Sequence, residues 1–159
     1  MTSSDLIQAG TFDDVSPTGV VTVYAFYELL PAAATFITTM TVSPGDHITA
    51  TVSEAVTNNW TIAVTDITTG QTYHTTVSYT SSYSSAEWIE EDPTDSGGQL
   101  APLDNFGTVT FSDGSTIMNG VSSSIATTNP STTTLVSHGA AVAVPSALSG
   151  NGFRVTYQP

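Results

Sequence analysis

Residues His47 to Tyr79 read HITATVSEAVTNNWTIAVTDITTGQTYHTTVSY. Valine, isoleucine, threonine and aromatic residues recur in this stretch in three short runs, and Thr69-Gly70 forms a turn sequence between the last two. Successive side chains of a strand point to opposite faces, and β-branched residues suit a pleated, half-buried surface. The stretch therefore predicts three neighbouring antiparallel strands, at His47–Glu54, Trp60–Asp66 and Gln71–Tyr79.

Similar short runs continue on both sides of this stretch. No segment shows a 3.6-residue apolar period, and turn sequences such as Ser43-Pro44-Gly45-Asp46, Ser96-Gly97-Gly98 and Asp113-Gly114 separate the runs. We expect a single domain over residues 1–159 whose fold class is all-β, an antiparallel two-sheet β-sandwich. The polar segment Ser122–Thr134 is expected to form a long loop. Further strands are predicted at Val20–Leu29, Thr35–Val42, Ser85–Asp92, Phe106–Ser112, within Thr132–Val144, and at Phe153–Tyr157.

The composition excludes several classes of partner. The 159 residues include 29 threonines, 20 serines, fourteen acids, one arginine and no lysine, and the formal net charge is −13. Nucleic acids and anionic membranes are therefore poor partners, and no apolar run reaches the length of a membrane span. Below about pH 4 most of the carboxyl groups become neutral, and the chain has few ion pairs to lose. The charge alone is compatible with solubility at neutral pH and with adaptation to acid.

Common catalytic and metal-binding arrangements are missing from the sequence. The histidines are His47, His74 and His138, and no serine stands in a G-x-S-x-G sequence. No cysteine or closely spaced histidine pair predicts a zinc site. The spacing of Asp92-Pro93-Thr94-Asp95 falls short of a dedicated calcium loop. We therefore predict neither a metal nor a cofactor.

The segment SSAEWIEEDPT, residues 84–94, contains three glutamates within five residues, and strands generally avoid glutamate. On a strand, Glu87 and Glu91 would share one face about 13 Å apart, at about 3.3 Å per residue. A glycosidase pair needs a separation of about 5 to 9.5 Å, so this segment does not form such a pair by itself. Any second catalytic group would come from another strand.

Several motifs in this order resemble the glutamic peptidases, the eqolisin family. The segment AEWIEED (residues 86–92) and the following GGQLAPLDNFGTVTFSD (residues 97–113) are similar to the signature region of that family. The resemblance extends from about Asp5 to the C-terminus. It also includes LIQAGT (6–11), VYAFYELLP (23–31), TVSPGDHITATVS (41–53), ITTGQT (67–72) and SGNGFRVTYQ (149–158).

The resemblance implies a concanavalin- or lectin-like sandwich and a catalytic pair of one glutamine and one glutamate. Carried onto this sequence, the pair is Gln8 and Glu91. Glu90 stands where the family usually has an aliphatic residue, and Trp88 is expected in the core. The residues expected to line the substrate cleft are Tyr24, Phe26, Tyr27 and Glu28, with Phe26 in place of the family's tryptophan.

The function implied is that of a secreted, extracellular endopeptidase that acts on polypeptides in acid. A carboxylate can take a proton from water, and an amide can orient that water and stabilise the oxyanion. The alternative is a non-catalytic β-sandwich module that binds peptide or glycan, and a glycosidase using Glu28 and Glu91 is a third option. Family members carry strands before the glutamine, so we also expect a missing N-terminal chain or self-association to cover an exposed edge.

Overall fold

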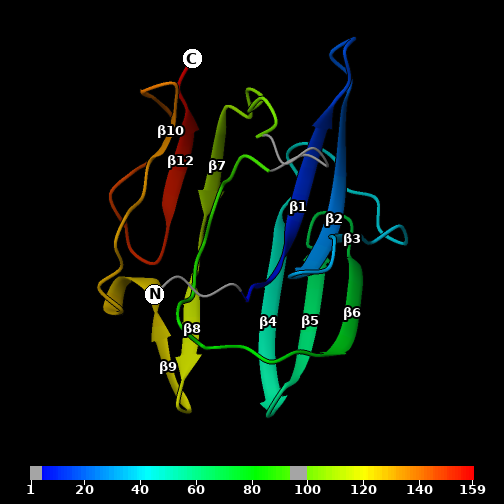
Figure 1. Cartoon of the computed structure of the whole chain (residues 1–159), viewed down its shortest axis with the longest axis vertical. Helices are drawn as coiled ribbons and strands as arrows, with labels where there is room; N and C mark the ends of the chain where they lie inside the picture. Colours follow the sequence, from blue (N-terminus) through cyan, green and yellow to red (C-terminus); the bar gives the residue numbers. More distant parts are fainter. Residues whose placement is uncertain (1–4, 94–99) are drawn as a thin grey trace. The chain divides into compact units, whose positions relative to one another are not determined.

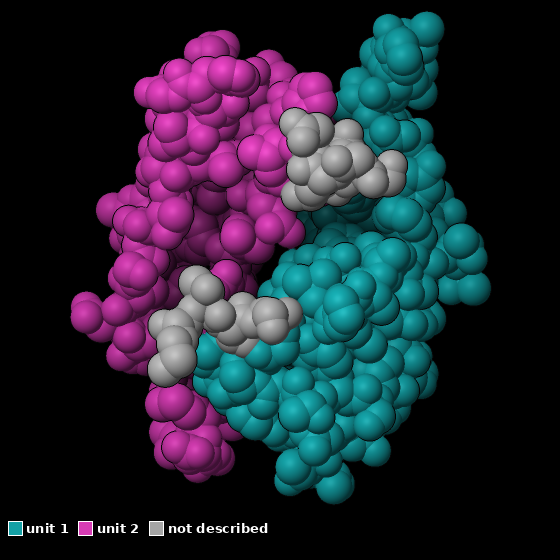
Figure 2. Space-filling view, in the orientation of Figure 1, with its two compact units in different colours: residues 1–84 teal, residues 85–159 magenta. Residues whose placement is uncertain are grey.

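The computed structural model describes residues 5–93 and 100–159 and is almost entirely composed of strands and loops (Figure 1). The chain divides into two compact units, residues 1–84 (unit 1) and residues 85–159 (unit 2) (Figure 2). The strand pairs of the sheets are antiparallel, which confirms the all-β, antiparallel fold class. No helix in the described ranges is long and apolar enough to cross a membrane.

Unit 1 contains two antiparallel sheets. In the first sheet, β1 pairs with β2 and β2 with β3; in the second, β4 pairs with β5 and β5 with β6. The second sheet is the region predicted from the alternating sequence, with boundaries shifted by one or two residues. The bounds are β1 (Ile7–Val15), β2 (Val21–Leu29), β3 (Thr35–Phe36), β4 (Ile48–Val56), β5 (Asn59–Asp66) and β6 (Gln71–Ser78).

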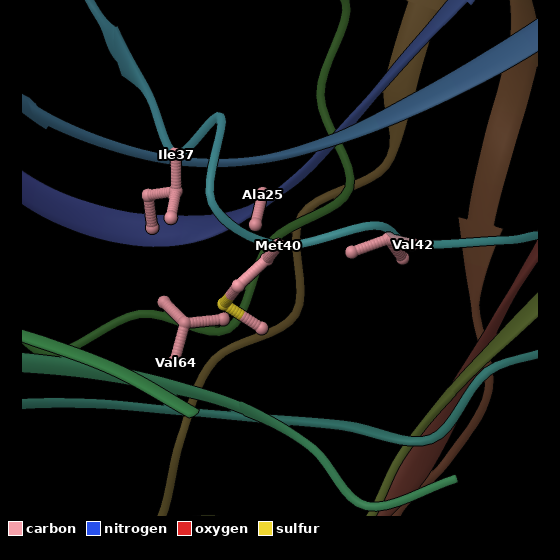
Figure 3. Close-up of a cluster of buried hydrophobic side chains, with 5 residues drawn as sticks. All are labelled: Ala25, Ile37, Met40, Val42 and Val64. Carbon is pink, nitrogen blue, oxygen red and sulfur yellow. The ribbon is translucent and has the colours of Figure 1, made fainter. Parts of the chain in front are cut away.

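An apolar core holds the two sheets of unit 1 together. Ala25 on β2 and Val64 on β5 are buried, and Ile37, Met40 and Val42 from the segment between β3 and β4 lie with them (Figure 3). Side chains of a strand alternate between faces, so the face of β2 that carries Ala25 is the core face. Polar and aromatic residues occupy the opposite face of β1 and β2.

Asp66 ends β5 and organises the turn that follows. It is fully buried, and its Oδ1 accepts hydrogen bonds from the backbone N–H groups of Thr68 (2.8 Å) and Thr69 (3.2 Å). The Thr69 hydroxyl donates to Oδ2 at 2.5 Å. This hydroxyl contributes most to lowering the pKa of Asp66, and the two N–H groups add to the effect against the opposing influence of burial. The buried carboxylate is thus stabilised in its charged form.

Asp66→Asn is expected to lower the melting temperature at pH 5 to 7 and to matter less in strong acid. A carboxyl with a lowered pKa in the folded state stabilises the fold above its unfolded pKa of about 3.9. That contribution is lost as the pH falls through the lower folded value. Thermal melts should show the gap between wild type and variant narrowing below about pH 3. A gap that stays constant down to that pH would contradict this role of the charge.

Unit 2 is built around a four-stranded antiparallel sheet and a separate hairpin. The order in the sheet is β10-β11-β12-β7, and β8 pairs with β9. A Cβ at Gly152 would collide with the backbone carbonyl of Phe111, so the close approach of the chain to β7 requires glycine there. The bounds are β7 (Thr108–Phe111), β8 (Ser115–Met118), β9 (Val121–Ser124), a 3₁₀ helix (Ile125–Thr127), β10 (Leu135–Ser137), β11 (Ala140–Pro145) and β12 (Phe153–Tyr157).

Two of the predicted strands are wrong as regular strands. Ser85–Asp92 contains no strand in the structure, and only the first two residues of Thr35–Val42 belong to β3. In the second case Met40 N–H donates to the Ile37 carbonyl, so the backbone turns while both side chains enter the core. The alternating apolar residues of Thr35–Val42 therefore indicate buried side chains, not an extended strand.

Other regions carry more strand than expected. The strand β1 was not predicted, and the expected loop Ser122–Thr134 begins within the β8–β9 hairpin and continues through the 3₁₀ helix. Serine-rich β9 has little β-propensity of its own and is paired through backbone hydrogen bonds with β8. The turn predicted at Ser96-Gly97-Gly98 lies outside the described residues.

Candidate active site

Gln8 and Glu28 form a side-chain pair on neighbouring strands of unit 1. Gln8 on β1 stands directly opposite Glu28 on β2, and its Nε2 donates to Oε2 of Glu28 at 2.8 Å. Both side chains are half-buried. A primary amide has two N–H donors and one carbonyl acceptor, and this bond uses one donor. The carboxylate thus orients the amide while its second N–H and its oxygen can serve another group.

Aromatic residues share the sheet face that carries Gln8 and Glu28. Alternation puts Phe26 and Tyr24 on the same side of β2 as Glu28. Gly10 stands opposite Phe26, and a Cβ added to Gly10 would lie 3.8 Å from the Phe26 ring. The Phe26 ring therefore lies against the backbone at Gly10, two residues after Gln8.

Two further aromatic residues belong to this face, although the sequence did not single them out. Phe36 on β3 pairs with Phe26, and its ring lies 5.2 Å from that of Tyr24 and 5.7 Å from that of Phe12, measured between centroids. Tyr24 and Phe36 are 40% and 44% exposed, which leaves an apolar surface beside the polar pair. The alternation of IQAGTFDDV on β1 would have indicated Phe12, four residues after Gln8, had this segment been identified as a strand.

Tyr27 is not brought together with these residues. It occupies the alternate face of β2, where it packs against the core cluster, and its ring stacks on Tyr73 at a centroid distance of 6.2 Å. The structure thus places Gln8, Tyr24, Phe26 and Glu28 on one face and Tyr27 on the other.

Glu91 belongs to unit 2, in a segment held by a tryptophan. Trp88 is half-buried, and a Cβ added to buried Gly114 would lie 3.2 Å from its indole ring. The buried side chain of Ile125 also lies against Gly114, whereas Trp88, expected in the core, is itself only half-buried. Because the segment is not a strand, strand alternation cannot assign its glutamates to faces. Glu91 is exposed and Glu90 half-buried.

The carboxylates on either side of Glu90 and Glu91 have different environments. Ser85 Oγ donates to Glu87 Oε1 at 2.8 Å, so Glu87 is engaged locally at the surface. Burial raises the pKa of Asp92, whose Oδ1 is buried with no hydrogen-bond partner in the described part of the chain. Residues 94 and 95 of the weak calcium sequence lie outside the described residues. Within residues 5–93 and 100–159, no group of three or more His, Cys, Asp or Glu residues could hold a metal ion.

Comparison with known proteins identifies the family of this chain. The model of the peptidase A4 family matches residues 1–157. Aspergillopepsin-2 from Aspergillus niger is 32% identical over 139 residues, which cover 84% of this chain and 47% of that protein. The chain therefore spans about half the length of this curated relative.

Solved structures agree in fold over nearly the whole chain. The aspergilloglutamic peptidase from Aspergillus niger superposes with a TM-score of 0.86 at 28% identity, covering 98% of this chain and 91% of that one. Scytalido-glutamic peptidase, solved with a transition-state analogue inhibitor, gives a TM-score of 0.82 at 27% identity and covers 98% and 77%. The predicted β-sandwich of the glutamic peptidases is thereby confirmed. The chain belongs to the peptidase A4 family, as its resemblance to the glutamic peptidases indicated.

Proposed function

We propose that this protein is an acid-acting endopeptidase in which Gln8 and Glu91 activate a water molecule. The observation that carries the proposal is the Gln8–Glu28 hydrogen bond on an aromatic sheet face, in a chain of the peptidase A4 family. Glu28 restrains an amide that must point at a reacting group, which is the type of pre-organisation that catalysis needs. The polypeptide substrate and an extracellular location are part of the same proposal.

In the proposed reaction Glu91 is the general base. It takes a proton from the water as the water oxygen attacks the peptide carbonyl, and the proton then passes to the departing amine nitrogen. The Gln8 amide accepts from the water through its oxygen and donates to the developing oxyanion through its free N–H. The water supplies the oxygen of the new carboxyl group, so no cofactor takes part.

The acid environment suits both groups and the chain as a whole. An amide does not titrate between pH 2 and pH 7, so Gln8 keeps its donor and acceptor in acid. A carboxylate that acts as a base in acid needs hydrogen bonds or solvent around it that favour its ionised form. The net charge of −13 at pH 7 decreases over the same range, which relieves repulsion within the fold. Catalysis and stability are thus compatible at about pH 4.

Hydrolysis of an unfolded protein at about pH 4 and at pH 7.5 tests the proposal. We expect new internal cleavage products at the lower pH, identified by mass spectrometry, and much slower cleavage at neutral pH. A non-catalytic module would bind the unfolded chain through its exposed aromatic residues without producing fragments. Binding without cleavage at any pH between 2 and 6 would overturn the peptidase proposal and favour that alternative.

Phe36→Ala should reduce the preference for peptides with apolar side chains. The exposed ring lies beside Tyr24 on the Gln8 face, and losing such a contact costs about 0.5–1.5 kcal/mol, close to a factor of ten in kcat/KM at the upper end. The measurement compares kcat/KM for peptides that carry leucine or serine near the cleaved bond. The control is Val21→Ala, an exposed residue on the other face of β2. An equal loss for both peptides would indicate a general effect on the fold.

A further inference from the structure

Tyr79, the residue after β6, joins the ends of two strands of the other sheet of unit 1. Its hydroxyl accepts a hydrogen bond from the backbone N–H of Leu6 at 2.7 Å and donates to the carbonyl of Leu30 at 2.9 Å. Leu6 immediately precedes β1, and Leu30 immediately follows β2. One side-chain atom thus connects both strands at the end where Gln8 and Glu28 are paired.

The hydroxyl takes the place of one bond of the antiparallel ladder. Leu30 N–H donates directly to the Leu6 carbonyl at 3.0 Å, as in a hydrogen-bonded pair. Such a pair normally exchanges a second, reciprocal bond, from Leu6 N–H to the Leu30 carbonyl. Here the Tyr79 hydroxyl is inserted into that second bond. Because hydrogen-bonded pairs recur every two residues, the next such pair along the strands is Gln8 and Glu28.

Tyr79 is itself held by the second sheet. Its backbone N–H donates to the Asn58 carbonyl at 3.0 Å, and Trp60 Nε1 donates to its carbonyl at 3.0 Å. Three residues later, Ser82 N–H donates to Asp5 Oδ2 at 2.7 Å, just before β1. The β4–β5 hairpin therefore fixes the position of the Tyr79 hydroxyl. The hydroxyl in turn fixes the beginning of β1 through its hydrogen bond with Leu6.

We infer that Tyr79 is a positioning residue for Gln8. Its inserted hydroxyl sets the distance between β1 and β2 at the hydrogen-bonded pair next to Gln8 and Glu28. That distance in turn sets the direction of the Gln8 side-chain amide. Without the hydroxyl, the Leu6 N–H would either bond directly to the Leu30 carbonyl or remain unpaired. A direct bond would bring β1 and β2 closer together. This role rests on the proposed peptidase function, since the amide is positioned for that reaction.

The test compares Tyr79→Phe with Tyr83→Phe. The Tyr83 hydroxyl also donates one hydrogen bond, to Glu54 Oε1 at 2.6 Å, and its ring stacks on Trp60. Among the residues that the structure describes, it has no hydrogen bond to β1 or β2. At a temperature well below both melting transitions, Tyr79→Phe should lower kcat about tenfold to a hundredfold with KM unchanged within about twofold. Tyr83→Phe should leave both constants within about twofold of wild type. Equal kcat values for Tyr79→Phe and wild type would overturn the inference.

A spectroscopic measurement decides the inference independently of activity. The Gln8 side-chain amide resonances are assigned as the pair that disappears in Gln8→Ala, and they should shift in Tyr79→Phe but not in Tyr83→Phe. If the wild type shows no hydrolysis, the proposed function fails while this shift still tests the role of Tyr79. If Tyr79→Phe does not fold, the inference can still be tested by measuring hydrogen exchange of the Leu6 amide in the wild type. A Leu6 amide protected like those within β1 would support the inserted hydroxyl, and one that exchanges as fast as an unfolded chain would overturn it.

Discussion

Replacing Glu91 by glutamine should remove peptide hydrolysis at pH 4 while leaving the fold unchanged. General-base catalysis by a positioned carboxylate contributes about 10²–10⁴ in rate, and an amide cannot take the proton from water. Glu91 is exposed, so the substitution should not disturb packing. The rate is measured with a peptide substrate, and melting curves establish that the variant is folded.

The matched control is Glu90→Val, on the adjacent carboxylate. Valine restores the kind of residue that the family usually has there, and we expect the rate to stay within a few-fold of wild type. Both substitutions remove one negative charge from the same segment, so a difference between them cannot come from net charge. If Glu90→Val abolishes hydrolysis and Glu91→Gln does not, the base is Glu90, although the family is the same.

Gln8→Ala should lower kcat by about 10²–10³, since removing one oxyanion-hole donor has an effect of this size. The loss would be larger if the same amide also positions the water. The change leaves Glu28 without the amide that donates to it at 2.8 Å, so the stability of the variant has to be measured together with its rate.

A second glutamine of unit 1 provides the control for this truncation. Gln71 accepts from the backbone N–H of Thr41 and donates to its carbonyl, both at 3.2 Å, at the start of β6. Gln71→Ala should affect stability and leave kcat within about twofold at temperatures below the melting transition. Equal reductions of kcat in both variants would mean that the Gln8 effect is structural.

Much of the fold could be predicted because it rests on side-chain alternation. The strands β4 to β6 and β12 follow from runs of β-branched residues between turn sequences, and their buried faces match the pattern. Alternation was misleading at Ile37–Val42, because apolar side chains can reach a core from a turning backbone. It also failed at Ser85–Asp92, where Trp88 holds the chain by packing rather than by a ladder of backbone bonds.

The candidate site was predictable only in part, because a local sequence pattern does not specify how strands pair. Motif resemblance supplied Gln8 and Glu28, but their hydrogen bond depends on the register of β1 with β2, which no local pattern specifies. Phe36 joins this face through two-residue β3, which is too short to show alternation. Tyr27 follows the motif but packs toward the core, because successive residues of β2 face opposite sides.

A crystal structure of the chain at about pH 4 would give the distances from Gln8 and Glu91 to a single water, on which the proposed reaction depends. We predict one ordered water within about 2.6–3.2 Å of both the Gln8 amide and the Glu91 carboxylate, with the Gln8–Glu28 bond intact. Side chains too far apart for one water to reach both would contradict the proposed catalytic pair.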